Sequence, residues 1–392
     1  MKEYYDIVVV GGGPAGCYTA NIAAEKGARV LVLEKDREIG VPVRCAEGIG
    51  GESLSEFFEP DPRWIANRIE GFSLASPDGT VVDIANKEIG YILERRIFDR
   101  EIGRRAVEAG AIIQTRSTAS NLLFEGHRIA GVQFVHLNQH HEVKAKLIIG
   151  ADGVESRVGR WAGLKTACPL RDMEICAQYA LVNLNIDPTR LQLWFGHDVA
   201  PGGYLWIFPK SATTANVGVG ISGEYSGAHP PFYYLDKFIQ QHFPTSSVTG
   251  ATTGAVPCSG GVIPIVTDGL MLVGDAAHQA NPLSGGGIAT ALKAARIAGR
   301  VAAEVIQEGN VSQKRLMAYQ KEWMKVMGRD HRRFYRLKEA VYAMTDEALN
   351  QTAHKVSAIE YPKRTLVKAF QIALFNQPKL LLDIPKLFFQ MG

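Results

Sequence analysis

The chain has 392 residues, of which 46% are hydrophobic and 21% are charged, a balance that is typical of a globular protein rather than a disordered or fibrous one. Its length exceeds the usual size of a single hydrophobic core, which predicts two lobes and a tail. A net charge of +3 is too small to favour nucleic acid as a partner.

The sequence contains no segment that is typical of an exported or membrane-spanning protein. Its first three residues carry no apolar signal region, and no stretch approaches the roughly 20 apolar residues of a membrane span. The 5 cysteines include no C-x-x-C pair, which predicts neither a disulfide framework nor a metal site. We therefore expect a cytoplasmic protein.

The first forty residues follow the order strand, G-x-G-x-x-G, helix, strand, acid. An apolar strand at 6–10 enters the turn Gly11-Gly12-Gly13-Pro14-Ala15-Gly16, and a helix at 15–26 and a second strand at 29–33 follow. The first glycine permits the tight turn, the second lets a pyrophosphate approach the backbone, and the third lets the helix pack against the strand. The helix N-terminus attracts phosphate, and an acid at the end of the second strand accepts hydrogen bonds from a ribose diol. This order predicts a nucleotide site that includes Gly11, Gly13, Gly16 and Glu34.

Three later segments have the composition of ligand-binding loops. Residues 40–51 combine glycine and proline with charge, and an apolar strand ending at 150 leads into Ala151-Asp152-Gly153. A third strand, at 269–273, leads into Gly274-Asp275, and three glycines at 285–287 precede a long helix. Asp-Gly alone is more often a turn than a site. Three glycines before a helix have no helical role, so we expect a planar ligand to approach them closely.

Between these loops the chain alternates between helix and strand, and then becomes rich in strands. Residues 69–93 read as a hairpin that turns at 77–79, and a helix at 94–109 precedes a strand near 112. Residues 128–150 read as two strands, and 174–222 as a β-rich second lobe. In that lobe Tyr204, Trp206 and Phe208 share one strand face, which is either core or the wall of an apolar ligand cavity.

The residues after 311 read as helical. Their late segment, 366–391, mixes apolar and basic side chains. It is either a helical cap on the body of the protein or a peripheral contact with a membrane surface.

The first βαβ unit, the helix that starts near Arg95 and the Gly274-Asp275 segment point at one ligand. Their combination resembles the FAD-binding lobe of the flavoprotein group that includes para-hydroxybenzoate hydroxylase. Within that group, the run from Pro42 to Gly48, the aromatic run from Pro201 to Lys210 and the late Gly-Asp segment look like the geranylgeranyl reductase family, and closest to the archaeal-type digeranylgeranylglycerophospholipid reductases. The resemblance covers residues 1 to about 310.

The resemblance implies an α/β fold with a Rossmann-like FAD-binding lobe, a β-sheet substrate lobe and a helical C-terminal tail. We expect the FAD-binding lobe at 1–52, 94–170 and 266–310, the substrate lobe at 53–93 and 171–265, and the tail at 311–392. It places these residues at the cofactor: Ala15, Glu34, Cys45, Ala46, Gly48, Arg95, Ala119, Asp275, Gly287 and Ile288. From the motifs around them we add Lys35, Arg44, Asp152, Pro282 and Gly286.

The implied reaction is the reduction of isolated C=C bonds in an isoprenoid chain of a lipid. Such a bond needs a proton as well as a hydride, so we expect a dry, aromatic-walled site with one proton source. Tyr204, Cys45 and Trp206 are our catalytic candidates, and Tyr204, Trp206 and Phe208 are the expected substrate wall. For Cys45, an ordinary role as a small buried hydrophobe stays open.

Other activities of the same fold stay open at this stage. An FAD-dependent aromatic monooxygenase or halogenase would use the same FAD lobe, although Tyr204 replaces the first Trp of the halogenase W-x-W pattern. A chlorophyll-type geranylgeranyl reductase and a flavoprotein that only binds lipid are further alternatives. No second G-x-G-x-x-G is present, so the electron donor could be NAD(P)H, a ferredoxin-type protein or a quinol.

Overall fold

The computed structural model describes residues 4–85, 89–261 and 264–375, which form two compact units. The first unit contains the described residues of Met1–Val43, Arg95–Cys168 and Pro257–Arg332. The second contains those of Arg44–Glu94, Pro169–Val256 and Arg333–Gly392. Each unit is therefore assembled from three separate stretches of the chain.

An eight-stranded sheet forms the centre of the first unit. Its parallel strands lie in the order β18 (Leu270–Leu272), β11 (Gln139–Gly150), β1 (Tyr4–Val10), β2 (Val30–Leu33) and β8 (Ile112–Gln114). Antiparallel to their neighbours are β17 (Val266–Thr267), β10 (Arg128–His136) and β9 (Ser117–Glu125). The side chains of β2, β18, residues 5–10 of β1 and residues 147–149 of β11 are almost completely buried. Continuous apolar runs of this kind are typical of a sheet that is covered on both faces.

The register of these strands brings the predicted motifs to one edge of the sheet. Val10 pairs with both Leu33 and Gly150, and Gly150 pairs with Leu272. Because these four residues form one row, the segments that follow them leave the sheet at the same edge. That edge is where ligands bind in open α/β sheets.

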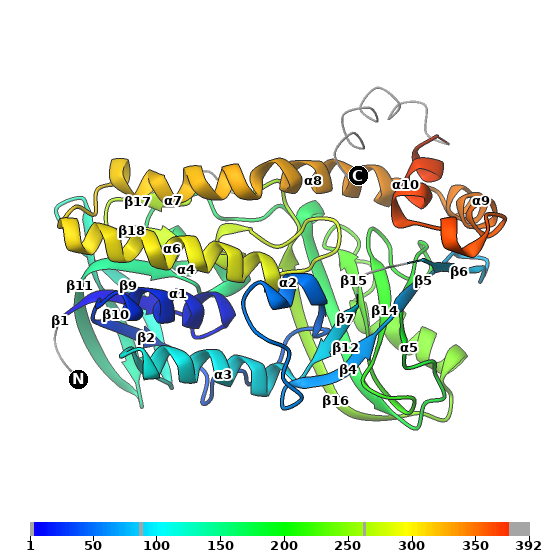
Figure 1. The fold of residues 1–392 in the computed structure, drawn as a ribbon, viewed down its shortest axis with the longest axis horizontal. Coiled ribbons are helices and arrows are strands. Elements are labelled where there is room, and N and C mark those ends of the chain that lie inside the picture. Colours follow the sequence, from blue (N-terminus) through cyan, green and yellow to red (C-terminus); the bar gives the residue numbers. More distant parts are fainter. Residues whose placement is uncertain (1–3, 86–88, 262–263, 376–392) are drawn as a thin grey trace. The chain divides into compact units, whose positions relative to one another are not determined.

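Helices α1 (Pro14–Glu25), α3 (Arg95–Glu108) and α6 (Ile288–Glu308) pack side by side, with α1 in contact with both others (Figure 1). Close packing of α1 and α6 depends on small residues: a Cβ on Gly299 would lie 2.7 Å from Ile22 Cβ. Helix α7 (Gln313–Val326) lies against α6 and β17, and α4 (Arg157–Trp161) contacts β9. Helix α6 ends at Gly309, whose φ of 68° is a common left-handed helix end.

A seven-stranded sheet forms the body of the second unit. Its order is β16 (Ser247–Pro257), β12 (Met173–Val182), β15 (Thr214–Ser222), β14 (Tyr204–Pro209), β13 (Arg190–Trp194), β5 (Gly71–Ala75) and β6 (Val81–Ile84). A smaller antiparallel sheet contains β3 (Gly48–Gly50), β7 (Gly90–Leu93) and β4 (Ile65–Ile69), and α2 (Gly51–Ser55) follows β3.

The seven-stranded sheet has two different faces. Leu205, Val217 and Val219 belong to a buried cluster with Leu235 of α5 (Pro231–His242). Because side chains alternate along a strand, the opposite face receives Tyr204, Trp206 and Phe208, as the period-two pattern predicts. One face therefore forms a core, and the other carries the aromatic row.

The C-terminal part of the described chain is mostly helical. Helix α8 (Gly328–Tyr342) spans the division between the units, and α9 (Asp346–Ser357) and α10 (Leu366–Phe375) follow it. Val356 and Ala369 pack with Val82 and Ile84 of β6, so these two helices cover the β5–β6 hairpin. Residues 376–391 of the expected apolar and basic segment lie outside the described residues. No described helix is long and apolar enough to cross a membrane.

The expected fold class is confirmed: an α/β protein with a Rossmann-like unit, a β-sheet unit and C-terminal helices. The elements that the sequence analysis did not specify include β4, β9, β16, β17, α2, α4 and α5, together with β3 inside a segment expected to be loop. The division into an FAD-binding lobe and a substrate lobe at the expected boundaries stays a prediction. The compact units divide after residues 43, 94, 168, 256 and 332.

Candidate active site

The glycine turn of the first unit is built so that two of its glycines have no room for a side chain. Gly11 has a φ of +106°, and a Cβ there would lie 2.2 Å from the carbonyl oxygen of Ala151. A Cβ on Gly16 would lie 1.9 Å from the Gly11 oxygen. Around Gly13, in contrast, no described atom lies within 4 Å of a built Cβ. The turn is thus closed toward the sheet and open at the glycine where a pyrophosphate is expected.

The carboxylate of Glu34 ties the end of β2 to the glycine turn. It accepts hydrogen bonds from the backbone N–H of Gly12 at 2.6 Å and of Asp36 at 2.7 Å. The Lys35 ammonium pairs with Asp36 at 2.6 Å. The Glu34 carbonyl accepts from Ser117, so β9, which carries Ala119, starts beside it. Each carboxylate oxygen keeps acceptor capacity for a ribose diol.

The late Gly-Asp segment contacts the start of α1. Gly274 has a φ of +71°, and a Cβ there would lie 2.9 Å from Ala15 Cβ. Burial raises the pKa of Asp275 to about 6, and the nearby Arg95 guanidinium opposes this rise. A Cβ on Gly287 would lie 3.5 Å from Asp275 Oδ1. The fold therefore gathers three segments that are far apart in the sequence.

The start of α6 is open to an anionic or carbonyl group. Asn281 Oδ1 accepts from the N–H groups of Leu283 and Ser284 and so shapes the loop, in which Pro282 is buried. Gly287 precedes Ile288 at the helix start, and no side chain caps this terminus. Free amide groups and the helix dipole make such a terminus a site for negative charge.

Asp152 carries the clearest sign of a missing partner. Its Oδ2 accepts from the Val158 N–H at 3.0 Å, but its buried Oδ1 has no hydrogen-bond partner among the described residues. Burial raises the pKa of this carboxyl group. Together with the open glycine and the uncapped helix, this orphaned oxygen fits a bound dinucleotide such as FAD.

In the second unit, two amide side chains hold the loop of residues 44–48. Gln178 on β12 donates to the Cys45 carbonyl at 3.1 Å, and Asn216 on β15 donates to the Ala46 carbonyl at 3.3 Å. Gly48 leaves room for Phe208, because a Cβ there would lie 2.7 Å from the Phe208 ring. Arg44, at the start of the loop, is exposed. The loop with the candidate thiol is therefore fixed on the aromatic face of the sheet.

A buried ion pair completes this attachment. Glu47 is 4% exposed and has a φ of +74°. Its carboxylate accepts from Asn216 at 2.7 Å and pairs with the Lys210 ammonium at 2.7 Å, and Lys210 also reaches Glu94 at 2.8 Å. Burial opposes the charge of Lys210, but the two carboxylates more than compensate and raise its pKa.

Trp206 lies over a strand of small residues. Its Nε1 donates to Gln178 Oε1 at 3.1 Å, and a Cβ on Gly218 would lie 2.4 Å from the indole. The Tyr204 ring lies 6.0 Å from the Trp206 ring in an edge-on arrangement. Aromatic rings in this order make a continuous apolar wall.

The structure thus brings the predicted residues together in two groups. The first unit holds Gly11, Gly13, Ala15, Gly16, Glu34, Lys35, Arg95, Ala119, Asp152, Asp275, Pro282, Gly286, Gly287 and Ile288. The second unit holds Arg44, Cys45, Ala46, Gly48, Tyr204, Trp206 and Phe208. The sequence analysis did not select Gln178 and Asn216. The alternation of polar residues on 174–178 was the available signal for Gln178.

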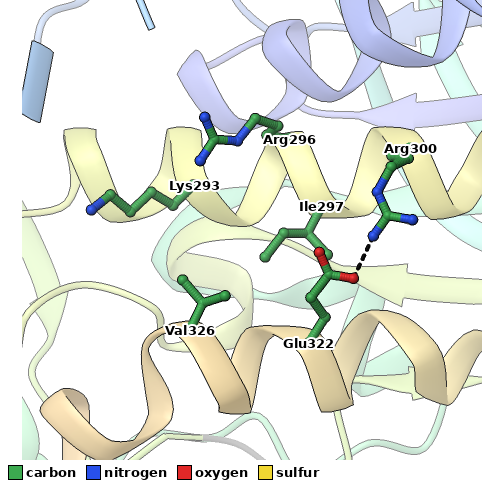
Figure 2. A pocket seen from close by; sticks show the side chains of 6 residues that line it. All are labelled: Lys293, Arg296, Ile297, Arg300, Glu322 and Val326. Atoms are coloured by element: carbon green, nitrogen blue, oxygen red, sulfur yellow. Dashed lines mark hydrogen bonds and ion pairs between the residues drawn. The ribbon is translucent and has the colours of Figure 1, made fainter. Parts of the chain in front are cut away.

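A pocket with a different lining lies between α6 and α7 (Figure 2). It has a volume of about 240 Å³. Arg300 of α6 forms an ion pair with Glu322 of α7 there. Its lining has three basic side chains, one acidic and two apolar, and consists of Lys293, Arg296, Ile297, Arg300, Glu322 and Val326.

Two family models match parts of the chain. Residues 172–256 match the geranylgeranyl reductase catalytic domain. Residues 9–54 match an NAD(P)-binding Rossmann-like domain. The first match covers the aromatic strand and both strands that carry the loop-binding amides, and the second covers the glycine turn.

Curated relatives match over almost the whole chain. Digeranylgeranylglycerophospholipid reductase 2 of Methanococcoides burtonii is 41% identical over 99% of this chain and 97% of its own length. The digeranylgeranylglycerophospholipid reductase of Methanosarcina mazei is 42% identical, again over 99% of this chain and 97% of its own length.

Among solved structures, a geranylgeranyl bacteriochlorophyll reductase-like protein from Thermoplasma acidophilum has a TM-score of 0.91 and 34% identity, covering 98% of this chain and 100% of that one. The flavin-dependent brominase Bmp2 is also similar, with a TM-score of 0.66, 18% identity and coverage of 98% and 100%. At that identity the brominase shows a shared fold alone.

Proposed function

This chain belongs to the digeranylgeranylglycerophospholipid reductase family, and we propose on that premise that its aromatic strand and the loop 44–48 form the isoprenoid site. The chain is an FAD-dependent oxidoreductase that saturates C=C bonds in the geranylgeranyl chains of a lipid. The observation that carries the assignment of the site is the attachment of loop 44–48 to the face that bears Trp206, by Gln178 and Asn216.

An isolated C=C bond is not electrophilic, so its reduction requires a proton and a hydride together. FAD, when bound and reduced, supplies the hydride. The residues of the chain must exclude water, hold the alkene and supply the proton. As one carbon accepts a proton, positive charge develops on the other, and aromatic faces stabilise nearby positive charge.

We assign roles to individual residues on this basis. Trp206 and Phe208 form the wall along the isoprenoid chain, and Tyr204 donates the proton to the alkene. Cys45, whose carbonyl is held by Gln178, lines the reacting end of the site. In the first unit, Gly13 and Glu34 bind the pyrophosphate and the ribose, and Asp152 Oδ1 and the start of α6 bind the remaining polar groups of FAD.

The electron donor that the surface chemistry favours is an acidic, ferredoxin-type protein. Three of the six side chains that line the pocket between α6 and α7 are basic and one is acidic (Figure 2). It lies on the helix whose start we assign to the flavin, which supports docking of such a donor there. Anaerobic reduction of the bound flavin by reduced ferredoxin, but not by NAD(P)H or a quinol, would support this donor. The rate should fall at high salt and in Arg296→Glu.

We also propose that the C-terminal helices make a peripheral contact with the membrane that contains the substrate. Tyr361 and Leu366 are exposed, at 43% and 38%, beside the exposed Lys363 and Lys368. Apolar side chains next to ammonium groups are typical of contacts with lipid headgroups. Sedimentation with anionic vesicles tests this, and equal recovery in a Leu366→Ser variant would contradict it.

The decisive experiment is anaerobic. The purified protein is reduced with dithionite and mixed with a geranylgeranylated phospholipid without oxygen. Reoxidation of the flavin together with a gain of two hydrogens per double bond establishes the reductase. Flavin that stays reduced until air is admitted would instead favour the monooxygenase or halogenase alternative. The Tyr204→Phe variant should keep FAD and lose turnover; unchanged turnover removes Tyr204 from the mechanism.

A further inference from the structure

A buried acid on the aromatic face has no role in the function described so far. Glu174, at the start of β12, is 7% exposed, and neither of its carboxyl oxygens has a hydrogen-bond partner among the described residues. Burying a polar group without a partner is costly. Such a group in a folded protein therefore calls for a specific explanation.

Burial favours the neutral form of Glu174, and the nearest cation is held by another acid. The buried Lys338 ammonium donates to Asp172 at 2.9 Å, and the Tyr335 hydroxyl donates to Asp172 at 3.1 Å. The Lys338 ammonium of α8 thus pairs with the Asp172 carboxylate rather than with Glu174. Burial raises the pKa of Glu174 to about 8; Lys338 opposes this rise, and the charge of Asp172 adds to it. At neutral pH the Glu174 carboxyl therefore keeps its proton.

The carboxyl lies beside the candidate catalytic residues. A Cβ built on Gly220 would lie 3.3 Å from the Cys176 thiol, 3.7 Å from the Trp206 ring and 3.9 Å from Glu174 Oε2. These three groups therefore converge on one point. Tyr204 pairs with Gly220 on the neighbouring strand, so its side chain leaves the sheet next to that point and on the same face. Cys176, whose pKa burial raises, and Tyr204 complete the titratable groups that face Glu174 from the sheet.

We propose that Glu174 is the proton reservoir of the isoprenoid site and reprotonates Tyr204 between reductions. This inference rests on the proposed function. In each reduction the alkene gains a hydride from reduced FAD on one carbon and the Tyr204 hydroxyl proton on the other. The tyrosinate then takes the Glu174 proton, which is favourable because tyrosine is the weaker acid. The Glu174 carboxylate finally recovers a proton from solvent, which restores the starting state.

The test uses the full-length, FAD-loaded protein and the variants Glu174→Gln and Glu174→Asp. Glu224→Gln, a substitution of an exposed acid, is the matched control. The first readout is the infrared C=O band of a protonated carboxylic acid near neutral pH. We expect this band in the wild type and in Glu224→Gln, and its loss in Glu174→Gln. This readout is independent of turnover.

The second readout separates the first reduction from later ones, with excess dithionite and geranylgeranylated lipid. In Glu174→Gln the first double bond should be reduced at the wild-type rate, because Tyr204 starts with its proton. Later reductions should slow by about 10²-fold, within the usual contribution of acid–base catalysis. Glu174→Asp should retain the infrared band and recover most of the later rate. The wild-type steady-state rate should fall as the pH rises through about 8, where Glu174 ionises.

Two results would overturn the proposal: wild-type steady-state turnover in Glu174→Gln, or an equal slowing of the first and later reductions, which indicates a structural role. If Glu174→Gln does not fold, the band and pH profile of Glu174→Asp and the wild type decide in the same way. If the wild type reduces no lipid at all, the proposed function fails. The infrared band still tests the reservoir in that case, and its absence refutes a proton on Glu174.

Discussion

Replacing Gly218 with alanine tests the packing beneath Trp206. The added methyl carbon would lie 2.4 Å from Cζ2 of the indole, 2.6 Å from its Cε2 and 2.7 Å from the carbonyl oxygen of Ala177. Carbon atoms pack at roughly 3.5–4.0 Å, so the indole must move by about 1 Å or more. Such overpacking costs about 1–3 kcal/mol. Loss of the Trp206–Gln178 hydrogen bond adds about 1 kcal/mol.

We therefore expect Gly218→Ala to lower the free energy of unfolding by about 2–4 kcal/mol. The near-ultraviolet circular dichroism of the indole should change, and lipid reduction should slow. Gly227→Ala is the matched control, because no described atom lies within 4 Å of a Cβ at that position. It should be neutral or slightly stabilising, since alanine restricts the unfolded chain. Equal urea unfolding curves and equal circular dichroism for the two variants would refute the packing argument.

Three further predictions concern charge, backbone space and pH. Lys210→Met should lower the free energy of unfolding by about 3 kcal/mol and loosen loop 44–48 to proteolysis, because it leaves the Glu47 carboxylate buried without its cation. Gly16→Ala should yield folded protein with little bound flavin, as judged by the absorbance ratio of flavin to protein, because the methyl group displaces the turn. Hydrogen bonds from the Arg29 and Lys146 side chains outweigh burial and lower the pKa of Asp6 to about 2. This stabilisation, about 2 kcal/mol, is complete above about pH 4 and is lost as the pH falls toward 2, so the stability deficit of Asp6→Asn should vanish over that range.

Each of these predictions has a result that would contradict it, and the lysine variant has a matched control. Lys237→Met removes an exposed lysine and should leave the loop protected; equal proteolysis of both lysine variants would contradict the ion-pair argument. Full flavin occupancy in Gly16→Ala would mean that the turn tolerates a side chain. A deficit of Asp6→Asn that persists below about pH 2 would contradict the assigned pKa.

The sequence predicted best those features that depend on neighbouring residues. Glycine spacing, strand periodicity and helix length are local, so the helix after the glycine turn, expected at 15–26, is observed at Pro14–Glu25. The alternation along 204–208 likewise predicted the aromatic face. The alternation did not reveal which residues contact these rings, because the contacting residues come from other strands.

The residues that the sequence did not reveal depend on register between distant strands. Gln178 and Glu174 become part of the candidate site only because β12 pairs with β15, and β15 with β14. Gly218 reads as an ordinary strand glycine until Trp206 is placed over it. Glu174 also lacks a cation of its own because Lys338, from a helix far along the chain, donates its hydrogen bond to Asp172 instead.

The order of strands in the first unit has a consequence for how the protein is made. β18 completes the parallel sheet, yet the ribosome synthesises it only after every strand of the seven-stranded sheet. β1 and β11 can pair early, but the edge that receives Asp275 and the start of α6 stays incomplete until late in translation. Nascent or truncated chains that end before residue 288 therefore lack part of the proposed nucleotide site. We expect flavin to bind only after this segment has been made and has folded onto the sheet.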